Sequence, residues 1–226
     1  MMNFKKRLKL VNCQKDLKMN DNKDANRELQ EEIFRRKLDE KYRSYIPNGK
    51  SERFISKVGT NKYFVSLFSA ANGVGKTACG ANMLAHMMFP CGGKYFQHLL
   101  YTDFPYSKNG RIVSDTTTIT EQIVPELKKW FPKNRYVTSK NRKSYDYNWK
   151  TDTGFDFDLM TYNQSIDEFE SVSLGFCWFD EPPPEAIYKA TVSRMRLGGI
   201  IFITATPLMG SAWMYDKIYT QAILSE

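Results

Sequence analysis

The 226-residue sequence lacks any apolar run that approaches the ~20 residues of a membrane-spanning helix, so it predicts no transmembrane segment. Its basic start, MMNFKKRLKLVN, contains neither an uninterrupted apolar stretch nor a small-residue cleavage site, and we therefore expect no signal peptide. The sequence also has no internal repeat and no low-complexity segment. Cysteine is scarce, and the cysteines show no disulfide-framework spacing, which favours a reducing compartment: Cys13, Cys79, Cys91 and Cys177.

Histidine is scarcer still. His86 and His98 are the two in the sequence, and both lie close to Cys79 and Cys91. Four such side chains could suggest a zinc site, but they lack the C-x2-C pair that is typical of structural zinc. They also overlap a glycine–lysine motif and the helix expected after it. Ordinary packing is the better interpretation, and we expect no metal at these residues.

The composition is 42% hydrophobic and 14% aromatic, which suits one sizeable domain, or one domain with an arm. The net charge of +8 lies in residues 1–62, where 17 Lys and Arg face 9 Asp and Glu, and the remainder is neutral. Residues 128–150 carry eight basic groups against Asp146 alone, whereas residues 151–185 carry nine acidic groups and no basic one. This segregation indicates a surface that faces a polyanion in one place and a metal or coupling site in another. A solvated loop explains the basic run equally well.

Residues 20–46 have the pattern of an amphipathic helix, with apolar side chains at three- and four-residue steps: Leu29, Ile33, Phe34, Leu38, Tyr42 and Tyr45. Pro47, Asn48 and Gly49 are expected to end this helix. The sequence therefore predicts a basic N-terminal arm, residues 1–46, followed by one domain, residues 47–226.

After Pro47 the pattern alternates between strands and helices. Strands are expected at 63–68, 98–102, 111–114, 176–179 and 200–204, helices at 76–88, 119–130, 185–195 and 211–222, and a β-hairpin at 145–160. Short, wholly apolar strands that alternate with helices are typical of a parallel sheet covered on both faces. We expect a three-layer α/β fold with a mainly parallel central sheet, a β-hairpin insertion and an N-terminal helical arm.

The stretch SAANGVGKT follows an expected strand and begins an expected helix. Ala70-x4-Gly75-Lys76-Thr77 fits the phosphate-binding loop, with Ala in place of the usual first Gly. Glycines allow backbone N–H groups to turn toward phosphate, and the helix N-terminus adds a partial positive charge. Lys76 is expected to reach the β- and γ-phosphates, and Thr77 to offer its hydroxyl to Mg²⁺. The candidate ATP-binding residues here are Ala70, Asn72, Gly73, Val74, Gly75, Lys76, Thr77 and Ala78.

Two further motifs end apolar strands. FCWFDE supplies Asp180, expected to hold Mg²⁺, and Glu181, expected to orient or activate the attacking water. IIFITATPL places Thr204, Ala205 and Thr206 at the end of another strand, where hydroxyl groups could sense the γ-phosphate. A threonine-capped turn before a proline explains this last motif equally well.

The succession of YRSYIPNGKSERF, SAANGVGKT, VPELKKWFP, WFDEPPPEAIY and SRMRLGGIIFITATPLMG resembles the ATPase domain of the large terminase subunit of tailed bacteriophages. That subunit is the motor that packages DNA into capsids. The resemblance covers roughly residues 42–222, and WFDEPPPEAIY followed by TATPL is its most particular part. It implies a P-loop NTPase of the ASCE (RecA-like) class that uses ATP and Mg²⁺. Glu181 would be the catalytic glutamate, Asp180 the Mg²⁺ ligand and Thr204-Ala205-Thr206 the coupling motif.

The resemblance also implies partners and a mode of action. The segment Pro47–Phe54 would hold adenine, with Ser51 and Phe54 beside the base. Family members form homo-oligomeric rings, expected here to be pentamers, on the portal protein of the procapsid in the cytoplasm of the infected bacterium. The small terminase subunit and double-stranded DNA are the other expected partners, and no membrane is involved. We therefore expect a motor that couples Mg-ATP hydrolysis to DNA translocation.

Two departures from the family pattern matter. Many members carry an arginine inside the phosphate loop, whose variable positions here are Ala71, Asn72, Gly73 and Val74. A neighbouring subunit is then expected to supply the arginine, and Arg194 is the candidate, with Arg196 and Arg142 as alternatives. The glutamine often present in the adenine segment has no counterpart in PNGKSERF, so selectivity for adenine need not be strict.

The family's C-terminal nuclease domain would lie beyond Glu226, and we expect no nuclease activity in this chain. The acidic run 151–170 is no substitute, because its aspartates fall on a solvated face of the expected hairpin. For DNA, the N-terminal arm and the basic segment 128–150 are competing candidates. The candidate contacts within the segment are Lys140, Arg142 and Lys143.

Two other classes of protein are alternatives. A helicase-type translocase also uses a phosphate loop and a D-E pair, but it usually carries two such domains in one chain. A non-catalytic, nucleotide-gated DNA-binding or assembly protein would be expected to lack Lys76 or Glu181, and both are present. A GTPase is disfavoured because the sequence contains no N-K-x-D motif.

Overall fold

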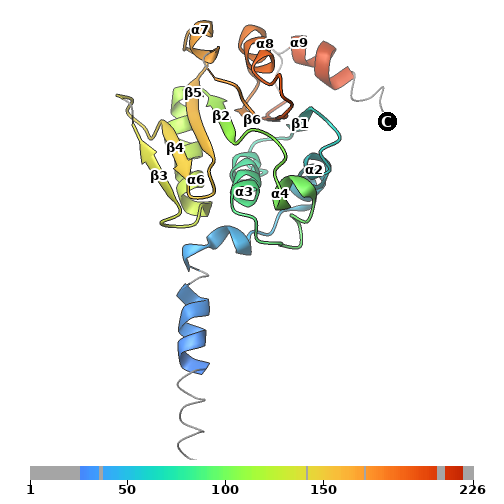
Figure 1. Cartoon of the computed structure of the whole chain (residues 1–226). Helices are drawn as coiled ribbons and strands as arrows, with labels where there is room; N and C mark the ends of the chain where they lie inside the picture. Colours follow the sequence, from blue (N-terminus) through green and yellow to red (C-terminus); the bar gives the residue numbers. More distant parts are fainter. Residues whose placement is uncertain (1–25, 36–37, 141, 171, 208–211, 221–226) are drawn as a thin grey trace, which may run out of the picture. The chain divides into compact units, whose positions relative to one another are not determined.

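The structure, a computed structural model, describes residues 26–35, 38–140, 142–170, 172–207 and 212–220 (Figure 1). The described chain divides into two compact units, with the boundary between Lys41 and Tyr42. In the first unit, residues 26–35 are helical and expose apolar side chains such as Leu29 and Phe34. This covers part of the amphipathic helix expected over 20–46, of which residues 20–25 and 36–37 lie outside the described residues. The last part of that prediction is wrong, because residues 41–44 form a separate 3-10 turn and residues 40, 45 and 46 are not helical. The division of the chain at residue 46 stays a prediction.

The second unit contains, within the described residues, a seven-stranded sheet with the order β1-β7-β6-β2-β5-β4-β3. The parallel part comprises β1 (Val65–Ser69), β7 (Ile200–Ala205), β6 (Phe176–Asp180), β2 (Asn109–Ser114) and β5 (Asp156–Thr161). Two antiparallel strands extend it beyond β5: β4 (Asn148–Thr151) and β3 (Tyr136–Ser139). The expected mainly parallel sheet is confirmed, and β4 and β5 form the expected hairpin.

Helices cover both faces of this sheet. Successive side chains of a strand point to opposite faces, so one strand can contribute to a buried cluster on each side. In β6, Phe176 and Trp178 belong to one buried cluster, and Cys177 and Phe179 to another. The first cluster includes side chains of α3 (Lys76–Met88) and α6 (Val124–Trp130), and the second those of α7 (Ile166–Phe169) and α8 (Glu185–Ser193). The segment η1 (Lys41–Ser44) begins at the last residue of the first unit. The other helical segments in the described part of the second unit are α2 (Gly49–Gly59), α4 (Leu99–Thr102), α5 (Thr116–Thr118), η2 (Ile119–Ile123), α9 (Ala212–Met214) and η3 (Tyr215–Tyr219). No helix in the described ranges combines the length and the apolarity needed to cross a membrane.

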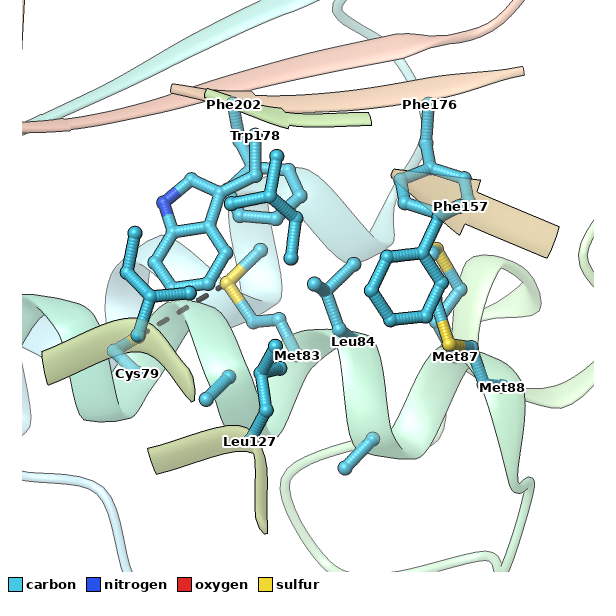
Figure 2. Packing of buried hydrophobic residues seen from close by; sticks show 14 of the residues in the cluster. Cys79, Met83, Leu84, Met87, Met88, Leu127, Phe157, Phe176, Trp178 and Phe202 are labelled. Atoms are coloured by element: carbon cyan, nitrogen blue, oxygen red, sulfur yellow. Dashed lines mark hydrogen bonds between the residues drawn. The ribbon is translucent and has the colours of Figure 1, made fainter. Parts of the chain in front are cut away.

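The helix that follows the phosphate loop, α3, packs directly on the sheet. Figure 2 shows Met83 and Met87 of this helix pointing toward the aromatic side chains of Trp178 and Phe157. Gly80 permits the close approach, since a Cβ at that position would lie 2.4 Å from the indole ring of Trp178. The same indole donates a hydrogen bond from Nε1 to Thr204 Oγ1 at 2.7 Å. One tryptophan therefore ties α3, β6 and β7 together.

The prediction of a strand over 98–102 is wrong. Residues Leu99–Thr102 form the single helical turn α4, in which Leu100 and Tyr101 are buried and Leu99 is exposed. An apolar run of this length fits a buried strand and one helical turn equally well, because it is too short to show a period.

Helix α2 is not indicated by the sequence patterns, which favour a helix stop at Pro47, Asn48 and Gly49. The side-chain oxygen of Asn48 instead accepts hydrogen bonds from the backbone N–H groups of Lys50 and Ser51, at 3.1 and 3.0 Å. These are the contacts of an N-cap residue, so the same residues that end one helical pattern begin a new helix.

The histidines and cysteines considered for zinc have packing partners instead. The ring of His86 stacks on Phe96 with centroids 3.5 Å apart, and the ring of His98 lies 3.2 Å from the hydroxyl of Ser56. Cys79 is buried in the core. Within the residues that the structure describes, no group of three or more His, Cys, Asp and Glu is placed to hold a metal ion.

Candidate functional site

Three motifs that are far apart in the sequence meet at the carboxyl edge of the sheet. β7 lies between β1 and β6, and the three strands are parallel, so the residues after them emerge side by side. Loop 70–75 follows β1, Asp180 and Glu181 lie at the end of β6, and Thr204–Thr206 lie at the end of β7. The strand order therefore brings the phosphate loop, the carboxylate pair and the threonine motif together.

Loop 70–75 has a backbone suited to phosphate. Gly73 and Gly75 have φ values of 79° and 82°, in the left-handed region that favours glycine, and no atom lies within 4 Å of a Cβ placed at either. The N–H of Ala70 donates to the carbonyl of Ala205 at 3.0 Å, which joins the start of the loop to β7. Helix α3 begins directly after Gly75, so its free N–H groups lie next to the loop.

Lys76 is only 8% exposed, and its ammonium group is held by neighbouring oxygens. Its Nζ donates to the backbone oxygens of Ala70 and Ala71, at 3.0 and 3.3 Å, and to the hydroxyl of Thr206 at 3.0 Å. A buried ammonium group needs such partners to offset its lost hydration. The positive charge is thereby fixed beside both the loop and the threonine motif.

Asp180 is almost fully buried, at 2% exposure. Its carboxylate accepts hydrogen bonds from the hydroxyl of Thr77 at 2.9 Å and from that of Thr204 at 2.5 Å. Burial raises the pKa of Asp180 to about 6, although the two threonine hydroxyls oppose the shift. The neighbouring charges act in opposite directions, because the carboxylate of Glu181 raises this pKa and the ammonium group of Lys76 lowers it.

Glu181 follows Asp180 with a φ of 71°, an uncommon left-handed conformation for a residue with a side chain. Its N–H donates to the carbonyl of Thr204 at 2.7 Å. Its carboxylate accepts from the backbone N–H of Thr206 and lies within hydrogen-bond distance of the Thr206 hydroxyl, both at 2.8 Å. The same hydroxyl lies 2.8 Å from Asn72 Oδ1, so Thr206 connects Glu181 to the phosphate loop.

Two residues that sequence reasoning missed hold the backbone of the carboxylate pair. The Tyr162 hydroxyl donates to the carbonyl of Glu181 at 2.7 Å, and Ser114 Oγ donates to the carbonyl of Asp180 at 2.8 Å. Both residues lie at the carboxyl ends of strands, Tyr162 after β5 and Ser114 at the end of β2. That position is the signal that could have suggested them, but the order of the strands is needed to place them next to β6.

A cavity of about 550 Å³ lies beside the loop, a volume typical of small-molecule sites. Eight of the predicted site residues line it: Asn72, Gly73, Gly75, Lys76, Thr77, Ala78, Asp180 and Glu181. Ala70 and Val74 are not part of its wall. The rest of the wall includes polar residues from the helical segment after β2, which the sequence patterns did not single out: Thr118, Glu121, Gln122 and Glu126.

The residues predicted to lie beside adenine are buried in α2. Ser51 has no exposed surface, and the ring of Phe54 stacks on Phe68 with centroids 5.0 Å apart. Neither lines the cavity at the loop. The side chain of this segment that reaches the loop is Asn48, whose Nδ2 donates to the carbonyl of Val74 at 2.9 Å. Adenine binding by this segment stays a prediction.

Two of the three candidate arginines lie away from the site of their own chain. The carbonyl of Arg194 accepts from the N–H of Leu174, just before β6, so Arg194 lies at the end of the strand opposite to Asp180. The length of β6 separates the two positions by roughly 15 Å. Arg194 pairs with Glu170 at 3.4 Å, and Arg196 follows on the surface. Either arginine could act only on a neighbouring molecule.

The basic segment 128–150 includes strand β3, which the sequence patterns do not indicate. Several of its cations are paired with acidic side chains of the fold: Lys128 with Asp146, Lys129 with Glu126, Arg135 with Asp152, and Lys150 with Asp156. The predicted DNA contacts are exposed and lie between β3 and β4: Lys140, Arg142 and Lys143. β4 runs antiparallel to β5, with Asn148 opposite Asp158, so β4 begins on the side of the sheet where β5 ends. The connection that leads into β4 therefore lies at the carboxyl edge of the sheet, as the phosphate loop does.

Thr77 and Asp180 are the residues that fit a Mg²⁺ ion. They present a hydroxyl and a carboxylate in direct contact, at 2.9 Å, and Mg²⁺ prefers oxygen ligands of this kind. The pKa of Asp180 stays raised although the charge of Lys76 lowers it, so the site lacks part of the positive charge that would offset the burial of this carboxylate. A divalent cation would supply that charge.

No protein-family model matches the sequence, and no curated protein matches it. Among solved structures, the chain is similar to the large terminase from a thermophilic bacteriophage in complex with ADP, with a TM-score of 0.58 and 14% sequence identity. The match covers 79% of this chain and 43% of that one, so this chain spans less than half the length of that terminase. At this identity the similarity establishes the fold, which is that of a P-loop NTPase.

Proposed function

We propose that this chain is the ATPase domain of a terminase large subunit, which couples the hydrolysis of Mg-ATP to the translocation of double-stranded DNA into a viral procapsid. The observation that carries the proposal is the convergence of Lys76, Thr77, Asp180 and Glu181 around one cavity at the carboxyl edge of parallel strands. A bacteriophage large terminase with the same fold was solved with ADP, which supports a nucleotide as the ligand.

Each residue has a role that its position supports. The N–H groups of the loop and of the first turn of α3 would bind the phosphates, and Lys76 would exchange its carbonyl partners for phosphate oxygens. Thr77 and Asp180 would hold Mg²⁺, which neutralises charge on those oxygens. Glu181 lines the same cavity and would orient and deprotonate the attacking water.

The threonine motif offers a route from the nucleotide to the rest of the fold. Thr206 contacts Lys76 and Glu181 directly, so a change at the phosphates would alter its hydrogen bonds. Thr204 bonds both to Asp180 and to the buried indole of Trp178. Changes at the catalytic edge would therefore reach the core under α3, which supports the coupling role expected for this motif.

The proposal includes a homo-oligomeric ring at the portal of the procapsid, with the small terminase subunit, in the cytoplasm of an infected bacterium. The phosphate loop contains no arginine, and the arginine of a neighbouring subunit would complete each site. Of the candidates, Arg142 lies on the edge of the sheet that carries the site, whereas Arg194 lies on the opposite edge. An arginine finger typically contributes ~10³–10⁵ in rate, so the isolated chain is expected to hydrolyse ATP slowly.

The test is ATP hydrolysis measured against protein concentration with Mg²⁺, for this chain and for Glu181→Ala. We expect a rate per molecule that rises with concentration and is lost in the variant, while nucleotide binding is kept. Nucleotide binding with an equally low rate in both proteins at every concentration would contradict the motor and favour a nucleotide-gated DNA-binding or assembly protein. ATP-dependent separation of duplex strands would instead favour a helicase-type translocase.

A further inference from the structure

Glu181 has a backbone conformation that glutamate rarely adopts, and hydrogen bonds on both sides hold it there. Its φ of 71° lies in the left-handed region. Its N–H donates to the carbonyl of Thr204, and its own carbonyl accepts from the hydroxyl of Tyr162, both at 2.7 Å. Such strained residues persist where their surroundings fix them, and they are concentrated at functional sites.

This left-handed turn decides where the carboxylate of Glu181 lies. Successive side chains of an extended strand point to opposite faces, so a regular continuation of β6 would turn Glu181 away from the side occupied by Asp180. In the structure both carboxylates line the same cavity. Asp180 accepts from Thr77, and Glu181 accepts from the backbone N–H of Thr206. The turn therefore places both groups around one site.

Tyr162 is well placed to hold this turn because it is itself anchored to β2. Its N–H donates to the carbonyl of Ser114 at 3.1 Å. Its hydroxyl carries a single proton and has carbonyl oxygens of Val113 and Asp180 at 3.3 Å, but the carbonyl of Glu181 is nearer, at 2.7 Å. Burial raises the pKa of Tyr162 well above its ordinary value, so the hydroxyl keeps the proton that it donates.

We infer that Tyr162 is a positioning residue for Glu181: its hydroxyl holds the left-handed turn and thereby keeps the carboxylate on the cavity side of β6. The inference rests on the proposed function, because it concerns the role of Glu181 in ATP hydrolysis. Tyr162 contacts the backbone of Glu181 and does not line the cavity, so it acts on the rate and leaves nucleotide affinity unchanged.

The first test compares Tyr162→Phe, Glu181→Ala and the double variant with the wild-type chain. Tyr162→Phe is expected to lower kcat about tenfold at unchanged affinity for a fluorescent ATP analogue. The double variant should be no slower than Glu181→Ala alone, since Tyr162 acts through Glu181. A matched control is Tyr106→Phe, which removes a hydroxyl that bonds to Asn61 elsewhere in the unit. Equal losses in both backgrounds, or a fall in affinity together with the rate, would overturn the inference.

A second test does not depend on turnover. Hydrogen exchange of single backbone amides is measured by NMR on the nucleotide-free chain and on Tyr162→Phe. We expect the amide of Glu181 to exchange about tenfold faster in the variant, while the amide of Trp178 in the same strand is unchanged. Unchanged exchange at Glu181, or an equal increase along all of β6, would show that Tyr162 does not hold the turn. If the wild-type chain hydrolyses no ATP, the proposed function fails, and this measurement still decides the inference.

Discussion

Thr206 binds Glu181 with two of its own groups: its backbone N–H donates to Oε2 at 2.8 Å, and its hydroxyl oxygen lies 2.8 Å from Oε1. The same hydroxyl accepts from the ammonium group of Lys76 at 3.0 Å. A phosphate that attracts Lys76 would change the surroundings of this hydroxyl, and Glu181 would lose or gain a hydrogen bond as a result. Charge at the phosphate loop and the position of Glu181 are therefore linked through one side chain.

Replacing Thr206 with valine tests this link, because valine keeps the branched shape and removes the hydroxyl. We expect hydrolysis at least about tenfold slower, because the hydroxyl contacts two charged groups, Glu181 and Lys76, with nucleotide affinity changed less than about threefold. Steady-state kinetics and nucleotide binding measure the two effects. Thr206→Ser keeps the hydroxyl and should retain most of the activity, whereas equal rates for the valine variant and the wild type would contradict the link.

Gly80→Ala is expected to destabilise the fold. The added methyl group would lie 2.4 Å from the buried ring of Trp178, and relieving such a clash in a packed core costs about 1–3 kcal/mol. Denaturant unfolding measures the loss. Gly49→Ala is the control, because no atom lies within 4 Å of a Cβ at that position, and its effect should stay within about 0.5 kcal/mol. Equal stability of the two variants would show that α3 can move away from β6 at little cost.

His86 should make the fold less stable in mild acid. Burial lowers its pKa to about 4, with Arg43 adding to the effect and the hydrogen bond to the carbonyl of Asn82 opposing it. In the unfolded chain the group titrates near pH ~6.5, so below this pH the unfolded chain takes up a proton that the folded chain does not. The free energy of unfolding contributed by neutral His86 is complete above that pH and falls as the pH decreases toward 4.

The size of this effect between pH ~7 and pH ~5 is about 2 kcal/mol. Chemical unfolding of the wild-type chain and of His86→Gln at the two pH values measures it, since glutamine does not titrate. The wild-type chain should lose more stability than the variant by this amount. The same loss in both proteins would mean that His86 takes up its proton at the same pH in the folded and in the unfolded chain.

The basic β3–β4 connection is expected to contribute to DNA binding. Neutralising Lys140, Arg142 and Lys143 together to glutamine should weaken binding to duplexes of any sequence. The plot of log affinity against log salt concentration should also become less steep by about 2–3, because each lost phosphate contact reduces the magnitude of its slope by ~0.9. The matched control is neutralisation of three lysines of the same segment that are already paired with carboxylates: Lys128, Lys129 and Lys150. Equal slopes for the two triple variants would exclude the connection as the DNA surface.

Much of the fold and part of the site could be predicted from local patterns. Small residues between an apolar strand and a helix indicate a phosphate loop, and an acidic pair after FCWF indicates the second half of the site. Both signals depend on neighbours in the sequence. The parallel sheet also follows from such patterns, because apolar strands that alternate with helices have few other arrangements.

The residues that hold the site together could not be predicted, for a different reason. Tyr162 and Ser114 act on the end of β6 because β2 lies next to β6 and β5 lies next to β2, and the order of strands is not a property of local periodicity. Asn48 belongs to a pattern that indicates a helix stop, but whether such a residue ends one helix or caps another depends on the residues after it. The predicted arginines show the same limit, since their distance from the site depends on strand direction.

The proposal that a neighbouring subunit supplies an arginine can be tested by mixing variants. Arg142 lies at the carboxyl edge of the sheet, where a neighbouring subunit of a ring could receive it, so Arg142→Ala is expected to lose hydrolysis. Mixing this variant with Glu181→Ala should restore up to about a quarter of wild-type activity, because some interfaces then combine an intact Glu181 with an intact Arg142. An arginine acting within its own chain would give no recovery. Arg194→Ala and Arg196→Ala are mixed with Glu181→Ala in the same way. Recovery with one of these variants, and not with Arg142→Ala, would show that the arginine comes from the segment that follows α8 in the neighbouring subunit.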